Sequence, residues 1–257
     1  MNIHRNLVAF KTILTREILR FMRIWIQTVM PPAINALLYL VVFGTLIGSQ
    51  VREVDGYRYM DYIVPGIIML SVIMNSYSNV VSSFYAAKFQ HFVEEMLISP
   101  VHNVVILAGF VAGGVARGLV VGAAVTAIAL LFTDLQVVNV WITLSVVLLT
   151  AILFSIGGFI NAIYANSFDD ISIVPNFILM PLIYLGGIFY SIQLLPPVWQ
   201  LVSKINPILY MVNGFRYGIL GVSDISIAYA FGIILAFIFA LGGFALYLLN
   251  RGVGLKQ

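Results

Sequence analysis

Long runs of apolar residues alternate with short polar stretches along most of the chain. Most runs reach about 20 residues, the length that a membrane-spanning helix needs. We expect six spans, at residues 32–47, 62–87, 104–132, 140–165, 173–185 and 227–249, with an elbow at Pro31 and Pro32 before the first. The pattern predicts an all-α polytopic membrane protein in which residues 1–257 form a single transmembrane domain.

The amino-terminal segment, residues 3–25, is amphipathic and too polar to span. Its apolar face, at the 3.6-residue period, carries Leu7, Phe10, Leu14, Ile18, Phe21 and Trp25. Its opposite face carries Arg5, Thr12, Arg16, Arg20 and Arg23. This pattern is typical of an interfacial helix that lies in the headgroup layer. We expect the basic face to meet anionic lipid or a partner protein.

A second amphipathic segment, residues 88–100, is also too polar to span and ends at Pro100. Its apolar residues repeat at helical spacing and are Phe89, Phe92, Val93, Met96 and Leu97. The other face carries His91, Glu94 and Glu95. Solvation of these charges and contact with another protein both explain this face.

The stretch from residue 185 to residue 221 is apolar but repeatedly interrupted. Gly186 and Gly187 close a hydrophobic run, Pro196 and Pro197 open a short helix, and Asn206 and Pro207 end that helix and start another. Proline lacks the N–H group that a helix interior needs, so this stretch is not a plain span. Broken backbone near membrane depth is tolerated where it is buried in protein or lines a cavity. The stretch therefore predicts a cap or a gate.

One face of the second span is polar. It carries Ser71, Asn75, Ser78 and Ser82 at steps of four, three and four, with Asn79 and Ser83 beside them. Hydrogen bonding between helices explains such a face, and so does the lining of a wet path.

Arg117 lies near the middle of the third span, beside Gly114, Gly118 and Gly122. Glycines spaced by four form a ridge that lets another helix approach closely. An arginine at the centre of a span costs at least about 2.5–3.5 kcal/mol. No carboxylate is central in any span, so we expect its partner to be a carbonyl, an amide such as Asn75 or Asn161, a lipid phosphate or an anionic substrate.

Composition and charge narrow the class of protein. The chain is 61% hydrophobic and 9% charged, against about 25% charged in soluble domains, which excludes a soluble fold. Basic residues favour both termini in the cytoplasm. The inner side then holds Arg5, Lys11, Arg16, Arg20, Arg23, Lys88, Arg251 and Lys256, and the outer side holds Arg52, Arg58, Lys204 and Arg216.

Several kinds of chemistry are absent from the sequence. There is no cysteine and no G-x-x-x-x-G-K-[ST] stretch, so the chain has no thiolate and no P-loop for ATP. His4, His91 and His102 are scattered, which predicts no metal site. Asp169 and Asp170 are expected to cap the next helix. We expect a conduit that another protein drives, and no enzyme.

Two patterns resemble a known family. They are EEMLISPV at 94–101 and LGGIFY…LPPVWQ…INPILYMVNGFRYGILG at 185–221, and the likeness covers nearly the whole chain. In this order and topology the sequence resembles the transmembrane permease subunits of type-2 ABC transporters, a group of bacterial ABC exporters. The resemblance implies a homodimer in the bacterial inner membrane that works with two copies of a separate ATPase subunit. That partner binds ATP and Mg, and the permease needs no cofactor of its own.

The resemblance also implies roles for particular segments. Residues 88–100 would be a cytoplasmic coupling helix, with Phe89, Phe92, Glu94, Glu95, Met96, Leu97, Ser99 and Pro100 as contacts of the ATPase. Arg16, Arg20, Asp169 and Asp170 would meet the ATPase or the membrane interface. Residues 190–221 would form outer re-entrant helices, and the gate would include Gly186, Gly187, Pro196, Pro197, Asn206, Pro207 and Arg216. The substrate path would include Ser71, Asn75, Ser78, Asn79 and Arg117.

Other readings of the sequence remain. Arg117 and the polar second span also fit an ATP-independent secondary transporter or channel, although such proteins often have broken helices in two related halves and here the break occurs once. A structural membrane protein is a third possibility. Membrane lipids are expected partners and nucleic acid is not. Arg117 and the basic amino terminus favour an anionic amphiphile or a lipid-linked molecule as substrate, but the sequence does not identify it.

Overall fold

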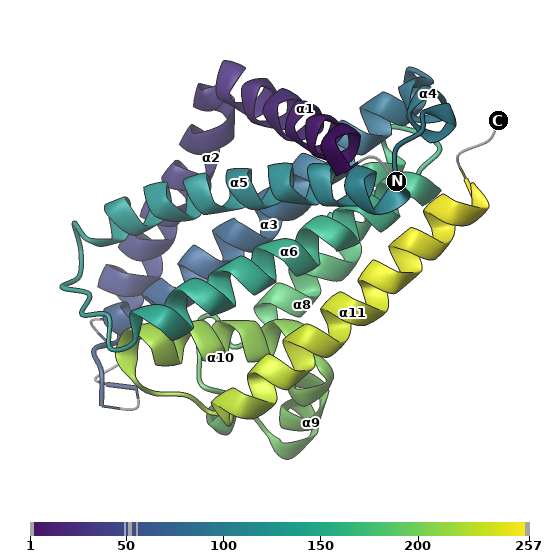
Figure 1. The fold of residues 1–257 in the computed structure, drawn as a ribbon. Coiled ribbons are helices and arrows are strands. Elements are labelled where there is room, and N and C mark those ends of the chain that lie inside the picture. Colours follow the sequence, from purple (N-terminus) through teal and green to yellow (C-terminus); the bar gives the residue numbers. More distant parts are fainter. Residues whose placement is uncertain (1–2, 49, 51–52, 55, 255–257) are drawn as a thin grey trace.

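The computed structural model describes residues 3–48, 50, 53–54 and 56–254, and this part of the chain is helical without any strand (Figure 1). The elements are α1 (Ile3–Arg23), α2 (Trp25–Tyr39), η1 (Leu40–Ile47), α3 (Tyr59–Phe89), α4 (Phe92–Ile98), α5 (Asn103–Ala129), α6 (Val140–Tyr164), α7 (Asp170–Val174), η2 (Pro175–Leu179), α8 (Met180–Tyr184), η3 (Ile192–Leu194), α9 (Pro197–Ile205), α10 (Pro207–Leu220) and α11 (Ile227–Arg251). The all-helical prediction is confirmed.

Among the described residues, five helical stretches are long and apolar enough to cross a membrane, and the first of them joins α2 to η1. They cover Trp25–Ile47, Tyr59–Phe89, Asn103–Ala129, Val140–Tyr164 and Ile227–Arg251. The expected span at 173–185 is a shorter apolar helix, Asp170–Tyr184, made of α7, the π-helical η2 and α8. At about 1.5 Å per residue it reaches about 22 Å, less than the hydrocarbon core of about 30 Å. The count of six spans therefore stays a prediction.

The elbow before the first span lies earlier than the sequence indicated. The chain turns at Ile24, and Pro31 and Pro32 lie inside α2. The turn is held by buried Thr28, whose Oγ1 donates to the carbonyl oxygens of Phe21 at 3.3 Å and Ile24 at 3.1 Å. Thr28 thereby links the first turn of α2 to the last turn of α1, which places the elbow at Ile24.

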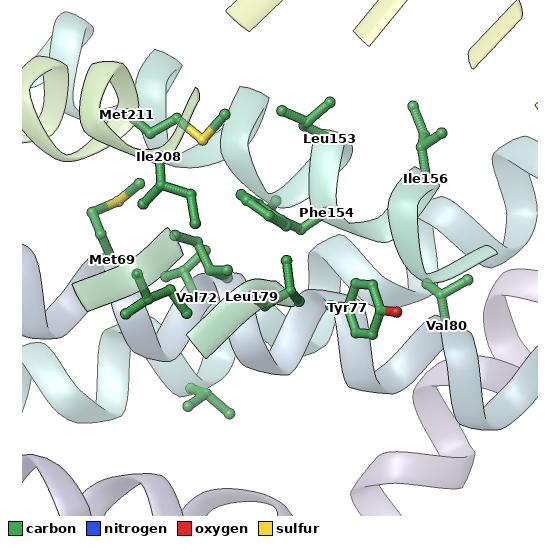
Figure 2. Packing of buried hydrophobic residues seen from close by; sticks show 14 of the residues in the cluster. Met69, Val72, Tyr77, Val80, Leu153, Phe154, Ile156, Leu179, Ile208 and Met211 are labelled. Atoms are coloured by element: carbon green, nitrogen blue, oxygen red, sulfur yellow. The ribbon is translucent and has the colours of Figure 1, made fainter. Parts of the chain in front are cut away.

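Helix α3 is the centre of the fold. It packs against α5, α6 and α10, and most of its length is buried. Figure 2 shows the apolar part of this packing. The labelled residues are Met69, Val72, Tyr77 and Val80 from α3, Leu153, Phe154 and Ile156 from α6, Leu179 from η2, and Ile208 and Met211 from α10.

The predicted glycine ridge of α5 faces α3. A Cβ on Gly114 would lie 2.9 Å from the carbonyl oxygen of Ser76, and one on Gly118 would overlap Ser76 Oγ. On α6, a Cβ on Gly158 would lie 2.5 Å from the carbonyl oxygen of Tyr77. The expected close approach of another helix is confirmed, since side chains at these positions would push α5 and α6 away from α3.

The helix bundle has two ends, which we name after α4 and α10 (Figure 1). The α4 end comprises α4, the start of α5, residues 165–169 and the end of α11, where Asn103 Nδ2 donates to Asn250 Oδ1 at 2.7 Å. The α10 end comprises α10, residues 56–58 and 130–139, where the Tyr57 hydroxyl donates to the carbonyl oxygen of Leu220 at 2.5 Å. Arg52 and Lys256, which entered the charge count, lie outside the described residues.

The broken stretch has the local structure that its prolines and asparagine predict. Pro197 begins α9 and Pro207 begins α10. Asn206 separates the two helices, since its Oδ1 accepts from the backbone N–H of Ile208 at 3.0 Å and its Nδ2 donates to the carbonyl oxygen of Leu182. Helix α9 exposes large apolar residues, whereas α10 is mostly buried against α6, α11 and α3. The two helices therefore differ in burial.

We predict that Gly118→Val destabilises the protein. The new side chain would overlap Ser76, and such overpacking typically costs about 1–3 kcal/mol. Thermal unfolding of the purified protein in detergent measures the effect. Gly232→Val on α11 is the matched control, because nothing lies within 4 Å of a Cβ there. Equal melting temperatures for the two variants would contradict the packing described.

Candidate functional site

The surface around α4 is the first candidate site. Helix α3 ends at Phe89, and His91 turns the chain into α4 with a φ of 62°, in the left-handed region. Lys88 fixes this turn to α6, because its Nζ donates to the carbonyl oxygens of Ile163 at 2.6 Å and Ala165 at 2.8 Å. A cation suits the carbonyl end of a helix. The sequence analysis gave Lys88 no such role.

Residues expected to contact an ATPase lie on this surface. Phe89, Phe92, Glu95 and Pro100 are exposed, and Glu94, Met96, Leu97 and Ser99 are partly buried. The inner side of α4 is held by buried Val93. The exposed set is available to another protein, and a solvated face remains compatible with it.

Helix α1 and the segment before α7 border the same surface. The guanidinium of Arg16 lies 5.7 Å from the ring centre of Phe92. Between α1 and the segment that follows α4 is a hollow of about 290 Å³, lined by Ala9, Thr12, Ile13, Arg16, Met96, Ser99, Val101 and Ile106. Phe168 packs against Phe89 with ring centres 5.3 Å apart. Three stretches far apart in sequence therefore meet at the α4 end.

Asp169 and Asp170 lie beside Phe168 on this end. Asp170 begins α7, and its Oδ2 accepts from the backbone N–H groups of Asn166 at 2.9 Å and Ser167 at 3.1 Å. Asp169 is exposed and makes no side-chain cap of α7. Asp170 thus orders the preceding loop, while Asp169 stays open to a partner.

A buried polar cluster lies between α1, α3 and α5. Glu17 of α1 is 0% exposed. Its carboxylate accepts from Ser83 Oγ, from Asn79 Nδ2 at 3.3 Å and from Arg20 Nη2 at 3.4 Å. Arg20 Nη2 also donates to the carbonyl oxygen and Oδ1 of Asn79, at 2.8 Å each. The structure thus brings Arg20 and Asn79 together, although the sequence analysis assigned them to different sites.

Arg117 meets one of the partners that the sequence suggested. Its Nη2 donates to Asn75 Oδ1 at 3.4 Å, and its Nε is buried and makes no hydrogen bond among the described residues. The centre of α5 therefore holds a cation whose hydrogen-bonding capacity is only partly used.

The other residues of the expected path divide between two places. Ser71 and Asn75 line a hollow of about 140 Å³ together with Pro32, Asn35, Ala36, Tyr39, Leu70, Met74 and Met180. Ser78 is half-buried, and its carbonyl oxygen accepts from Ser82 Oγ at 2.7 Å. Asn79 and Arg117 lie outside this hollow. The polar face of α3, which the sequence predicted as part of one path, therefore divides into residues that contact other helices and residues that line a small polar hollow.

At the α10 end, Arg216 ties the broken stretch to α3. Its Nη2 donates to the carbonyl oxygen of Gly187 at 2.6 Å, and its guanidinium lies 4.0 Å from the ring centre of Tyr62. Gly187 has a φ of 72°, which favours glycine. Gly186 packs against Ile208, and Asp224 accepts from Ser191 Oγ at 2.7 Å. The expected gate residues near Gly187 are therefore linked to α3 by a buried cation.

The sequence analysis missed Glu17, although the sequence contains the signal. Glu17 lies between Leu14 and Phe21 on the apolar side of α1, where a carboxylate has to find polar partners inside the protein. Among the described residues no group of histidine, aspartate and glutamate could hold a metal ion. The described sites therefore consist of protein contacts and hollows.

Comparison with known proteins identifies the family of the chain. Residues 8–220 match the family described as ABC-2 type transporter. The chain is 53% identical over 255 residues to the inner membrane transport permease YadH of Escherichia coli K12, covering 99% of each chain. It is 22% identical over 207 residues to nodulation protein J of Rhizobium meliloti strain 1021, covering 80% of this chain and 79% of that protein. With 53% identity over the full length and most of its residues matched, the chain belongs to the ABC-2 type transporter family.

Proposed function

We propose that this protein is the transmembrane subunit of an ATP-driven exporter in the bacterial inner membrane. Two copies would form the substrate path, and each would work with one copy of a separate ATPase subunit. The family match, the full-length similarity to an inner membrane transport permease and the absence of a P-loop from the sequence support this proposal.

The observation that carries the proposal is the surface at the α4 end. The exposed residues of α4 adjoin the basic face of α1 and the loop before α7. This surface has exposed aromatic side chains, Phe89 and Phe92, and aromatic residues are enriched where folded proteins meet. We assign α4 as the coupling helix and this surface as the ATPase contact, with both termini in the cytoplasm. ATP and Mg would bind to the partner.

Pairing of two permease chains is supported by apolar surface at the α2 side. Helix α2 and the π-helical η1 expose several large apolar residues, and Phe177 of η2 is 76% exposed. The hollow that contains Asn35, Ser71 and Asn75 lies between α2, α3 and α8. A second copy at this side would close the hollow into a path between protomers. Lipid covers such a face where protein does not.

The α10 end supplies the proposed outer gate. Exposed amphipathic α9 and buried α10 form two short helices before α11, in the order that the family resemblance implies. The broken backbone near Gly187 is anchored by Arg216. Displacement of α9 would open the path at this end while α10 stays packed.

One observation favours a second candidate, an ion-driven transporter. Arg117 lies within a span and uses only part of its hydrogen-bonding capacity. Charged residues inside spans often belong to ion pathways. Substrate uptake into vesicles driven by an ion gradient, without ATP and without an ATPase subunit, would favour this candidate over the exporter.

We predict that replacing Glu94 and Glu95 together by alanine lowers ATPase stimulation. Exposed charge pairs contribute about 0.2–1 kcal/mol each, so loss of two should reduce stimulation about fivefold. The measurement is ATP hydrolysis by the partner ATPase subunit with and without the purified permease. Membrane insertion should not change, because Glu95 is exposed and Glu94 half-buried.

Asp134→Ala is the control for this prediction, because Asp134 is an exposed carboxylate at the α10 end. It should leave hydrolysis unchanged. Normal stimulation by the double variant would count against α4 as the coupling helix. Failure of the unaltered permease to bind or stimulate the ATPase would reject the exporter proposal itself.

We predict that Arg117→Leu inserts normally but transports poorly. Removal of a central arginine saves about 2.5–3.5 kcal/mol of insertion cost. Loss of a charged hydrogen bond of about 1.5–3 kcal/mol to an anionic substrate should slow transport about ten- to hundredfold. Transport of a fluorescent anionic phospholipid by proteoliposomes measures it, with exposed Arg251→Leu as the control. Full transport by the Arg117 variant would assign that residue a structural role.

A further inference from the structure

The most unusual contact of the amino-terminal helix is made by Glu17. An amphipathic helix on a membrane surface keeps its carboxylates in water, yet this carboxylate is fully buried against α3. Hydrogen-bond donors reach it from two helices, with Ser83 and Asn79 on α3 and Arg20 on α1 itself. A buried carboxylate is stable only while these partners stay in place.

The backbone of α5 is shaped to admit this contact. A Cβ on Gly113 would lie 2.5 Å from Glu17 Cβ, and one on Gly109 would lie 2.9 Å from Ile13 Cβ. These two glycines lie one helical turn apart and face α1, whereas Gly114 and Gly118 face α3. Helix α5 therefore holds α1 on one side and α3 on another (Figure 1).

Arg20 fixes the position of α1 along α3. Its guanidinium donates to the carbonyl oxygen and Oδ1 of Asn79 and to Ser82 Oγ at 3.4 Å. A shift of α1 by one turn would keep the Glu17–Arg20 pair on α1 but separate both residues from Asn79, Ser82 and Ser83 of α3. Because that state is costly, α1 and α3 are held in one alignment.

We propose that Glu17 is a positioning residue that fixes α1 to α3 and α5, so that a displacement of α1 moves α3 with it. The inference rests on the proposed function, in which α1 and α4 meet the ATPase. Arg16 lies over Phe92 of α4, and one turn further along α1 Arg20 holds Asn79 of α3. Asn75, the contact of Arg117, lies one turn from Asn79 on α3. The fixed helix therefore connects the ATPase surface to the polar face of α3.

Glu17→Ala, measured in the full complex, tests this inference. We expect the variant to co-purify with the ATPase subunit as the unaltered protein does, because its ATPase-facing residues are unchanged. Its stimulation of ATP hydrolysis should fall about 5- to 150-fold, the range of typical coupling free energies. Glu17→Gln keeps hydrogen-bonding atoms without the charge. Its stimulation of ATP hydrolysis should lie between that of the unaltered protein and that of Glu17→Ala.

A cross-link separates positioning from stability alone. The chain has no cysteine, so Ile13→Cys with Gly109→Cys gives a single pair. Its Cβ atoms would lie 2.9 Å apart and a disulfide needs about 3.5–4.5 Å, so α1 and α5 have to separate by about 0.6 Å to form it. Oxidation of this pair in the Glu17→Ala background should restore stimulation, and reduction should abolish it again. The same pair with Glu17 present should work equally well oxidised and reduced, because α1 and α5 already move together.

Three results would overturn the inference. One is normal stimulation by Glu17→Ala with an unaltered amount of complex. Another is an oxidised cross-link that restores the melting temperature of Glu17→Ala but not its stimulation. A third is inhibition of the protein that retains Glu17 when the pair is oxidised. If the unaltered permease does not stimulate the ATPase at all, the proposed function fails instead, and the two failures are thereby distinguished.

Discussion

Burial of α3 in a low-dielectric interior is the constraint on which the rest of the structure depends. This helix carries serine and asparagine side chains along one face, and each has to be paired within the protein because lipid offers no partner. Glycines of α5 and α6 bring two backbones against it, which buries its apolar faces. The polar face is then left for α1, Arg117 and the hollow beside α2.

The same constraint determines where charged groups lie. Near the ends of α3, cations bind main-chain oxygens: Lys88 holds the end of α6, and Arg216 holds Gly187. Along its length, the buried carboxylate of Glu17 is matched by Arg20 and by neutral donors. A charge that is hydrogen-bonded in this way can be removed only by breaking its whole set of partners. These residues therefore define the alignment of neighbouring helices more sharply than apolar packing alone.

The sequence predicted what depends on local pattern. Apolar runs predicted most of the long helices, and Asn206 and Pro207 predicted the junction of α9 and α10. The glycines of α5 predicted the close approach of another helix. The sequence misplaced the elbow, because Pro31 and Pro32 lie inside α2 and the turn is held by Thr28, which bonds to the carbonyl oxygens of Phe21 and Ile24. The sequence could not predict the role of Asn79, because the choice between a wet path and a helix contact depends on where α1 packs. That position is a property of the tertiary structure.

Helix α3 also joins the two ends of the molecule. At the α4 end Lys88 ties it to α6, and at the α10 end the Tyr59 hydroxyl donates to the carbonyl oxygen of Phe189 at 3.0 Å while Tyr62 lies under Arg216. A helix that is buried along most of its length resists local bending, because bending would open voids on several sides. A push received at the α4 end would then reach the backbone near Gly187 through these contacts. In the proposed arrangement, α3 with the residues that fix it to α1, α6 and Gly187 would connect the ATPase surface to the gate.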